Sequence, residues 1–184
     1  PGVDRACDPD LKQLRMTLKF GGLLKLPKKS VDALFAEIQA RLHEELDYIN
    51  EASNICLFRD YHQNHPDILI PEVYSDLSTR RVLTLEYLEG DHAEELAKRA
   101  YSQEQINQLG ENLFKMLAAH LFEFQHIHGD PHPGNFAFRK DGSIVLYDFG
   151  CIKKLKPDIV SAYKDAISSS LAEDYDAVDF CQTR

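Results

Sequence analysis

A polar loop of ten residues, 126–135, constrains the fold more than any other part of the sequence, because of the segments that flank it. Before the loop, apolar residues recur at helical spacing over residues 106–124. After the loop, two short apolar runs, 136–139 and 144–147, flank Asp141-Gly142, a dipeptide typical of tight hairpin turns. The sequence therefore predicts a long helix, a loop and a β-hairpin in this order, which indicates an α+β domain.

Further helices are expected on both sides of this unit. Ser102 and Gln105 have the spacing of a capping box and place the start of the long helix. A second helix is expected from Ser30, a plausible N-cap, to about Ala52. Its apolar stripe consists of Val31, Leu34, Phe35, Ile38 and Leu42. A third helix is expected to begin at about Pro157.

Two short strands are expected between the first helices and the long helix. Residues 68–73 are mostly apolar, and Pro71 favours an edge position because proline cannot donate to a sheet ladder. Residues 81–88 are the stronger strand signal, and they end at Glu89-Gly90. Neither repeats nor low-complexity stretches interrupt this order.

The composition limits the classes of partner and compartment. A formal charge of −9 and a pI near 5.3 argue against general nucleic-acid binding, which needs a basic surface. The 184 residues suffice for one domain or part of a bilobal enzyme. No apolar run approaches the length of about 18 residues that a membrane span needs. Four scattered cysteines without a CxxC pair are expected to be reduced thiols in a reducing intracellular compartment: Cys7, Cys56, Cys151 and Cys181.

The loop and the hairpin carry residue types suited to phosphoryl transfer. Asp130 is followed five residues later by Asn135, which is the spacing of a kinase catalytic loop, and the hairpin delivers Asp148 directly before Phe-Gly. Mg²⁺ prefers carboxylate and amide oxygens as ligands, and phosphoryl transfer needs metal ions on the phosphate oxygens. The pattern predicts a magnesium site at Asn135 and Asp148, with Asp130 as the catalytic aspartate. His128 is expected to organise the loop and not to act as a base.

Two other interpretations of the same residues stay open at this point. An isolated Asp-Phe-Gly is usually a simple turn, although the joint pattern disfavours that interpretation. A loop with three imidazoles and a carboxylate could also ligate Zn²⁺ or Fe²⁺. The ligands of such a site would be His126, His128, Asp130 and His132, which would leave Asn135 and Asp148 without a role.

An acidic segment at residues 44–52 is the second informative place. In a continuous helix, carboxylates and one aromatic residue would share a face by the i, i+3, i+4, i+7 rule: Glu44, Asp47, Tyr48 and Glu51, with Glu45 adjacent. A kinase fold needs one helix carboxylate to hold the phosphate-binding lysine of a neighbouring strand. A solvated acidic face is the alternative. Residues 85–90 are similarly ambiguous, because they could form a hinge whose backbone at Glu86 and Leu88 pairs with adenine or a strand that ends in a turn.

Three motifs in order resemble one known family. Residues 128–135, His-Gly-Asp-Pro-His-Pro-Gly-Asn, closely resemble the HxDPHPGN signature of the UbiB (AarF/ADCK) atypical kinase-like family. Residues 45–52, Glu-Leu-Asp-Tyr-Ile-Asn-Glu-Ala, are similar to its ExD…EA helix motif. Pro1-Gly2-Val3 is similar to the end of its K-x-Q-x-P-G-V strand. The resemblance spans the chain from Pro1 to Asp148.

The resemblance implies a protein-kinase-like bilobal fold with ATP and Mg²⁺ bound between the lobes. Residues 1–88 would be part of the N-lobe, with the ExD helix and the hinge strand, and residues 89–184 would be the C-lobe, with the catalytic loop and the DFG hairpin. Asp130 would be the catalytic-loop aspartate, and Asn135 and Asp148 the magnesium ligands. Glu45, with Glu51 as the second candidate, would pair with the strand lysine.

The family also implies a biological setting. Its members support ubiquinone or other isoprenoid-lipid metabolism at a membrane, and ATPase activity is a better expectation than protein phosphorylation. The expected partners are therefore a nucleotide and lipid or ubiquinone-pathway partners, at a bacterial cytoplasmic face or in an organelle matrix. The basic, leucine-bearing segment 11–29 could lie on such a surface, although a helix packed on the body with solvated lysines is the favoured interpretation.

Departures from the family pattern keep two alternatives open. The strand lysine would precede Pro1, and no KxGQ motif, nucleotide-binding loop or APE motif stands in this sequence. One alternative is a phosphotransferase of the aminoglycoside- or choline-kinase type, which also has an H-x-D loop but usually lacks DPHPG and a literal DFG. The other is a catalytically silent pseudokinase scaffold. Retention of Asp130, Asn135 and Asp148 argues against the scaffold.

Overall fold

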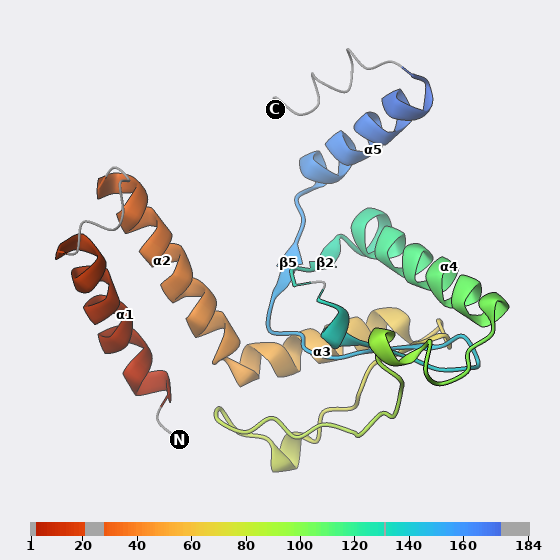
Figure 1. Ribbon diagram of the computed structural model, residues 1–184, viewed down its shortest axis with the longest axis horizontal. Helices are drawn as coiled ribbons and strands as arrows, with labels where there is room; N and C mark the ends of the chain where they lie inside the picture. Colours follow the sequence, from red (N-terminus) through yellow and green to blue (C-terminus); the bar gives the residue numbers. More distant parts are fainter. Residues whose placement is uncertain (1–2, 21–27, 131, 174–184) are drawn as a thin grey trace.

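The computed structural model describes residues 3–20, 28–130 and 132–173 as helices joined to two small sheets (Figure 1). The long helices are α1 (Val3–Phe20), α2 (Lys28–Glu45), α3 (Tyr48–His62), α4 (Gln103–Ala119) and α5 (Pro157–Leu171). The strands are β1 (Ile68–Leu69), β2 (His126–His128), β3 (Phe136–Phe138), β4 (Ile144–Leu146) and β5 (Ile152–Lys154). Short turns of helix are η1 (Ser75–Leu77), η2 (Ala93–Glu95), the π-helical η3 (His120–Phe124) and η4 (Pro133–Asn135).

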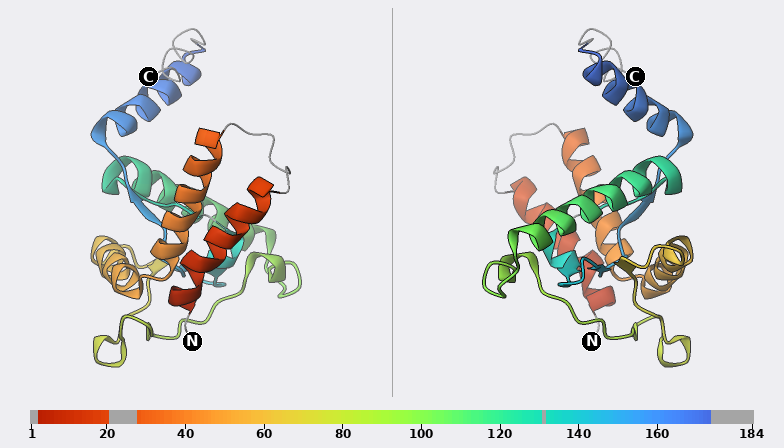
Figure 2. Two further views of the ribbon diagram at one scale, coloured as in Figure 1. Left: turned by 90° about the vertical axis from the view of Figure 1, so that its left-hand side faces the viewer. Right: turned by 90° about the vertical axis from the view of Figure 1, so that its right-hand side faces the viewer.

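The helices α1 and α2 form an antiparallel pair beside the rest of the molecule (Figures 1 and 2). An ion pair between Arg15 and Asp32 joins them at 2.5 Å, and both side chains are about 40% exposed, so it contributes little stability. The extended segment 70–90 lies at the end of the molecule opposite to α5. Among the described residues, no helix combines the length and the apolar character needed to cross a bilayer.

The two sheets confirm the predicted hairpin. One sheet has the order β1-β4-β3, with β3 antiparallel to β4 and β1 parallel to it. Gly142 in the turn has φ +91°, a conformation that glycine adopts without strain. The edge position predicted for residues 68–73 is also confirmed, although only Ile68 and Leu69 pair as a strand. The second sheet joins β2 to β5, with Ile127 opposite Lys153.

The main core lies where α3, α4 and the hairpin meet. The side chains of Ile55 and Phe58 from α3 are fully buried, as are Ile144 and Leu146 of β4. Full burial of a side chain such as Phe58 stabilises the fold by about 2 kcal/mol. The start of α4 is confirmed, because Ser102 and Gln105 form the predicted capping box with reciprocal hydrogen bonds.

The predicted single helix over residues 30–52 is wrong, because one helix, α2, ends at Glu45 and a second, α3, begins at Tyr48. Asp47 leaves the helical conformation and caps α3, with its side chain accepting a hydrogen bond from the Asn50 N–H at 3.2 Å. A carboxylate that binds the free N–H groups of a new helix favours a helix start at this position. Consequently, Glu44 and Glu45 belong to the last turn of α2, whereas Glu51 lies on α3.

The strand predicted over residues 81–88 is also absent as a regular element. Within the described residues it forms only isolated bridges, Val73 with Leu85 and Thr79 with Val82. The backbone is extended, as the alternation of apolar residues predicts, but no described strand runs beside it to build a ladder. The start of α5 at Pro157 is confirmed.

Two imidazoles form a buried pair between α3 and the end of α4. His62 and His120 are 5% and 1% exposed, and their Nε2 atoms lie 2.7 Å apart. One Nε2–H must donate to the other Nε2, so the accepting ring is neutral in this arrangement. Burial, reinforced by neighbouring imidazoles, lowers the pKa of His62 to about 4 and that of His120 to about 3.

This pair predicts a loss of stability in acid. Both folded-state pKa values lie below the ordinary value of 6.5, so the unfolded chain binds more protons as pH falls below about 6.5. The free energy of unfolding should therefore decrease between about pH 6.5 and pH 4, by up to about 1.4 kcal/mol per pH unit for each ring. Urea unfolding at several pH values measures this slope. His120→Leu should flatten it, whereas His92→Gln, at an exposed imidazole that does not act on the pair, should not; equal slopes in all three proteins would refute the assignment.

Candidate functional site

His128 connects the two segments that carry the predicted site. Its Nε2 lies 2.5 Å from the carbonyl oxygen of Asp148, so this nitrogen carries the proton and donates. Its Nδ1 then accepts a hydrogen bond from the Asp130 N–H at 3.2 Å. The ring is 7% exposed. Both ring nitrogens thus form hydrogen bonds with backbone groups. The imidazole has no free lone pair with which to abstract a proton, so its role is to position the two segments.

Asn135 closes the loop from its other end. Its side-chain N–H₂ donates to the carbonyl oxygen of Asp130 at 3.0 Å, across the turn η4. His132 caps this turn by accepting from the Gly134 N–H at 3.0 Å. Because the amide nitrogen is used within the loop, the amide oxygen is the atom of Asn135 left for a ligand. A hard cation such as Mg²⁺ prefers an oxygen of this kind.

Asp148 stands in an unusual backbone conformation. Its φ is 58°, in the left-handed region, where a non-glycine residue carries about 1 kcal/mol of strain. Its Oδ1 accepts a hydrogen bond from the Gly150 N–H at 3.1 Å, and this local bond suits aspartate to the position. The second carboxylate oxygen remains for a cation. Strain of this type concentrates at functional sites, where the surrounding contacts hold it in place.

The helix α3 holds the backbone of the residue after Asp148. The Phe149 N–H donates to the Glu51 carboxylate at 3.3 Å, and the Asn54 amide donates to the Phe149 carbonyl at 2.8 Å. The Phe149 ring is fully buried and packs edge-on against Phe58 of the same helix. The sequence reasoning missed Asn54, although its spacing of three residues from Glu51 places both on one helix face.

Removing the Asn54 amide should loosen this attachment. Asn54→Leu leaves the Phe149 carbonyl without its partner in a partly buried place, so the free energy of unfolding should decrease by about 1–3 kcal/mol. Ser53→Ala is the control, because Ser53 is exposed and its hydroxyl bonds only to Ile49 within the same helix. Urea unfolding of the three proteins measures the difference. Equal losses in both variants would mean that the contact with Phe149 contributes nothing.

The segment predicted as a hinge leaves two backbone groups available. The Glu86 N–H donates to the Glu72 carbonyl at 2.8 Å, and the Leu88 carbonyl accepts from the Tyr147 hydroxyl at 2.6 Å. Burial raises the pKa of Tyr147, as expected for a phenol held in its donating form. The Glu86 carbonyl and the Leu88 N–H bond to no described residue. These two groups offer the acceptor and donor that an adenine edge needs.

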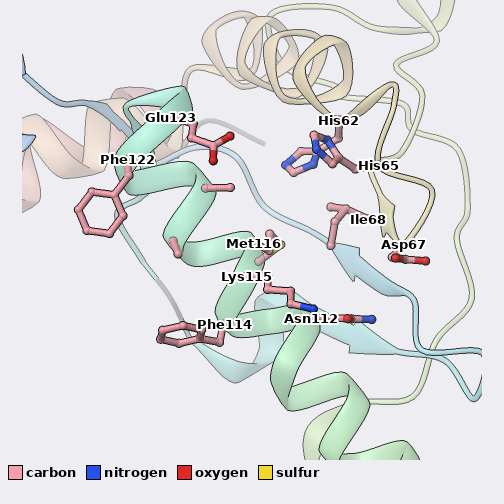
Figure 3. A pocket seen from close by; sticks show the side chains of 12 residues that line it. His62, His65, Asp67, Ile68, Asn112, Phe114, Lys115, Met116, Phe122 and Glu123 are labelled. Atoms are coloured by element: carbon pink, nitrogen blue, oxygen red, sulfur yellow. The ribbon is translucent and has the colours of Figure 1, made fainter. Parts of the chain in front are cut away.

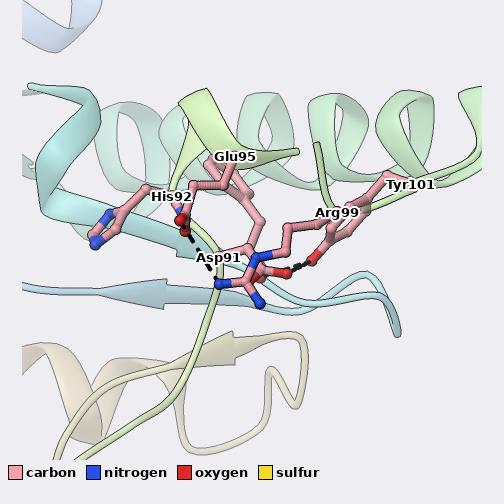
Figure 4. A network of polar contacts seen from close by, with 6 residues as sticks. Asp91, His92, Glu95, Arg99 and Tyr101 are labelled. Atoms are coloured by element: carbon pink, nitrogen blue, oxygen red, sulfur yellow. Dashed lines mark hydrogen bonds and ion pairs between the residues drawn. The ribbon is translucent and has the colours of Figure 1, made fainter. Parts of the chain in front are cut away.

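A polar network fixes the end of this segment to the start of α4 (Figure 4). The Tyr101 hydroxyl donates to Asp91 at 2.8 Å, and Arg99 lies 3.6 Å from the other oxygen of the same carboxylate. Glu95 is 3.7 Å from Arg99 and also accepts from the His92 N–H. Burial and the Asp91 carboxylate raise the pKa of Tyr101 to about 12. No sequence motif indicated this network.

Gly129 is required because the loop 126–135 closely approaches Cys151, the residue before β5. Its N–H donates to the Cys151 carbonyl at 2.6 Å, and a Cβ at residue 129 would lie 2.7 Å from that oxygen and 2.8 Å from the Cys151 Sγ. Because the carbonyl belongs to the backbone, a smaller side chain at residue 151 would not remove the clash. The loop position between His128 and Asp130 therefore depends on glycine.

Gly129→Ala should destabilise the protein by roughly 1–3 kcal/mol, since the backbone of β5 must move. Gly110→Ala offers a matched control, because a Cβ at residue 110 on α4 would meet nothing within 4 Å. In that helix the same substitution should stabilise by about 0.5–1 kcal/mol. Thermal unfolding distinguishes the two signs. A tolerated Gly129→Ala would show that the loop is not tightly packed on β5.

The histidines of the loop are turned to separate backbone groups. His126 Nδ1 lies 2.7 Å from the Phe124 carbonyl, while His128 and His132 bind as described above. Within the part of the chain that the structure describes, no group of three or more His, Cys, Asp or Glu side chains could hold a metal ion together. The geometry thus disfavours the transition-metal interpretation of this loop.

The remaining predicted residues are placed as follows. Glu51 reaches the site, whereas the side chains of Glu44 and Glu45 lie outside the described residues. The same holds for Pro1, Gly2 and Pro131, and Val3 begins α1. Of the four cysteines, Cys56 is exposed and Cys151 is buried.

A family model of the ABC1 atypical kinase-like domain matches residues 1–181. An uncharacterized protein of Synechocystis sp. is 33% identical over 167 residues, which cover 85% of this chain and 29% of that protein. Protein ACTIVITY OF BC1 COMPLEX KINASE 1, chloroplastic, of Arabidopsis thaliana is 33% identical over 184 residues, 95% of this chain and 26% of the relative.

A solved structure is similar over nearly the whole chain. It is the complex of Rv3197 with erythromycin from Mycobacterium tuberculosis, with a TM-score of 0.74 and 27% sequence identity. The match covers 98% of this chain and 45% of that one. The chain therefore spans less than a third of the curated relatives named above and less than half of this structure.

Proposed function

We propose, from the premise that this chain belongs to the ABC1 atypical kinase-like family, that it carries the ATP- and magnesium-binding site of an ATPase or phosphotransferase. The family membership confirms the predicted kinase-like α+β fold and the resemblance to UbiB proteins. The observation that carries the proposal is the position of His128, which ties Asp130 to Asp148 through its two ring nitrogens. A turn without function has no need of such a connection.

Asn135 and Asp148 are the residues that would hold Mg²⁺. The donor set fits a hard cation, because each side chain uses one polar atom within the protein and keeps one oxygen: Asn135 donates to Asp130, and Asp148 accepts from Gly150. When bound, the metal supplies positive charge to the phosphate oxygens. Asp130 is exposed at the loop and would orient the attacking hydroxyl or water and receive its proton.

For the helix carboxylate, we infer Glu51 in place of the first candidate, Glu45. Glu51 belongs to α3 and contacts the Phe149 N–H, so it lies beside the DFG segment. Glu45 ends the preceding helix, beyond the break at Asp47. A carboxylate that pairs with a phosphate-binding lysine must lie close to the metal site, and α3 provides that placement. Adenine would pair with the free backbone groups of Glu86 and Leu88.

The biological setting belongs to the same proposal. The resemblance to UbiB proteins supports a role in ubiquinone or other isoprenoid-lipid metabolism, with the protein at a membrane surface of a reducing compartment. Two relatives in Arabidopsis thaliana carry the names Protein ACTIVITY OF BC1 COMPLEX KINASE 1, chloroplastic, and Protein ACTIVITY OF BC1 COMPLEX KINASE 3, chloroplastic. The retained Asp130, Asn135 and Asp148 favour an active enzyme over a pseudokinase scaffold.

Thermal unfolding with and without MgATP tests the nucleotide site. The protein should be extended by the lysine strand that the family carries before Pro1. ATP at about one hundred times its Kd should add about 2.7 kcal/mol of stability, and EDTA should remove the effect. Asp148→Asn should lose the magnesium-dependent shift, while Asp165→Asn on the exposed face of α5 should keep it. Without any shift in the extended wild-type protein, the proposal fails and the scaffold becomes the better interpretation.

A further inference from the structure

A cavity of about 460 Å³ lies between the end of α3, β1 and the second half of α4, away from the site described above (Figure 3). None of its lining residues belongs to the catalytic loop, the DFG segment or the hinge. The volume is in the range of sites for small molecules. Apolar side chains of α4 and its π-helical extension, such as Met116 and Phe122, form much of one wall, and Ile68 of β1 lies opposite.

One wall of the cavity contains a buried polar group without a partner. His62 lines the cavity, is 5% exposed, and its Nδ1 forms no hydrogen bond with any described residue. Its Nε2 is committed to His120, whose own Nδ1 is equally unpartnered. Because one proton is shared between the two Nε2 atoms, one Nδ1 is a donor and the other an acceptor. A buried polar group without a partner is unfavourable in the folded protein.

Two carboxylates and one lysine line the cavity. Asp67 and Glu123 lie on opposite sides of it in Figure 3, and neither forms an ion pair with a described residue. Lys115 is the lysine of the lining, and its Nζ is 2.6 Å from Glu111. Lys164 lies 5.9 Å from the centre of the Phe122 ring, so this ring already accepts a cation. The surroundings thus favour a positive ligand over a negative one.

We propose that this cavity binds a small cationic amphiphile, a molecule with a flat apolar body and a protonated amine. The apolar body would lie along Met116 and Phe122, and the amine would be attracted by Glu123 and Asp67. This second site is independent of the nucleotide site, so either proposal can fail without the other.

Three probes with one indole body and different side-chain charge test the proposal: tryptamine, tryptophol and indole-3-acetate. Calorimetric titration of the protein at about pH 8, where an ordinary histidine is neutral, gives the three affinities. Tryptamine should bind about two- to fivefold more tightly than tryptophol, and indole-3-acetate more weakly than both, because exposed charges contribute modestly. Added salt should reduce the preference for tryptamine.

Two variants locate the binding. Glu123→Gln should bring tryptamine to about the affinity of tryptophol, whereas Glu104→Gln, at an exposed carboxylate near the start of α4, should change nothing. Ala119→Leu places a larger side chain at the wall and should weaken all three probes, with thermal unfolding as the check that the protein is folded. Equal affinities for the three probes, no binding at all, or binding that neither variant changes would each overturn the proposal.

Discussion

The two hydrogen bonds of His128 are the interaction on which the candidate site depends. They connect the Asp130 N–H to the Asp148 carbonyl through one buried ring, so the loop and the DFG segment are held at a fixed separation. Only neutral histidine with its proton on Nε2 can accept and donate in this way. The strained φ of Asp148 is maintained by the same bond, because the carbonyl cannot rotate without losing its donor.

The interruption of the helix at Asp47 allows α3 to contact both the DFG segment and the core. Because Asp47 caps a new helix, α3 need not continue along the axis of α2. One face of α3 can then hold Phe149 through Glu51 and Asn54, while Phe58 anchors the helix in the core. A single helix through residues 30–52 would carry its acidic groups on one continuous face. In the observed arrangement, Glu51 is directed to the Phe149 N–H.

Local patterns predicted the fold where a few neighbouring residues decide it. The capping box at Ser102, the turn at Asp141-Gly142 and the order of loop and hairpin are of this kind, and all are present. The break at Asp47 could not be predicted from periodicity, because the apolar spacing continues across it. The missing ladder at residues 81–88 depends on strand partners, which no local pattern reveals.

The candidate site follows the same division. The candidate residues Asp130, Asn135 and Asp148 can be proposed from residue type and spacing alone, because few side chains suit a magnesium site. The groups that position them bind backbone atoms: Asn54 binds a carbonyl, and Gly129 is defined by the close approach of β5. A contact with a backbone atom can form whatever the residue type at that position. The sequence of the contacted segment therefore gives no indication that the contact exists. The residues that position the candidate site can therefore be identified only from the three-dimensional structure.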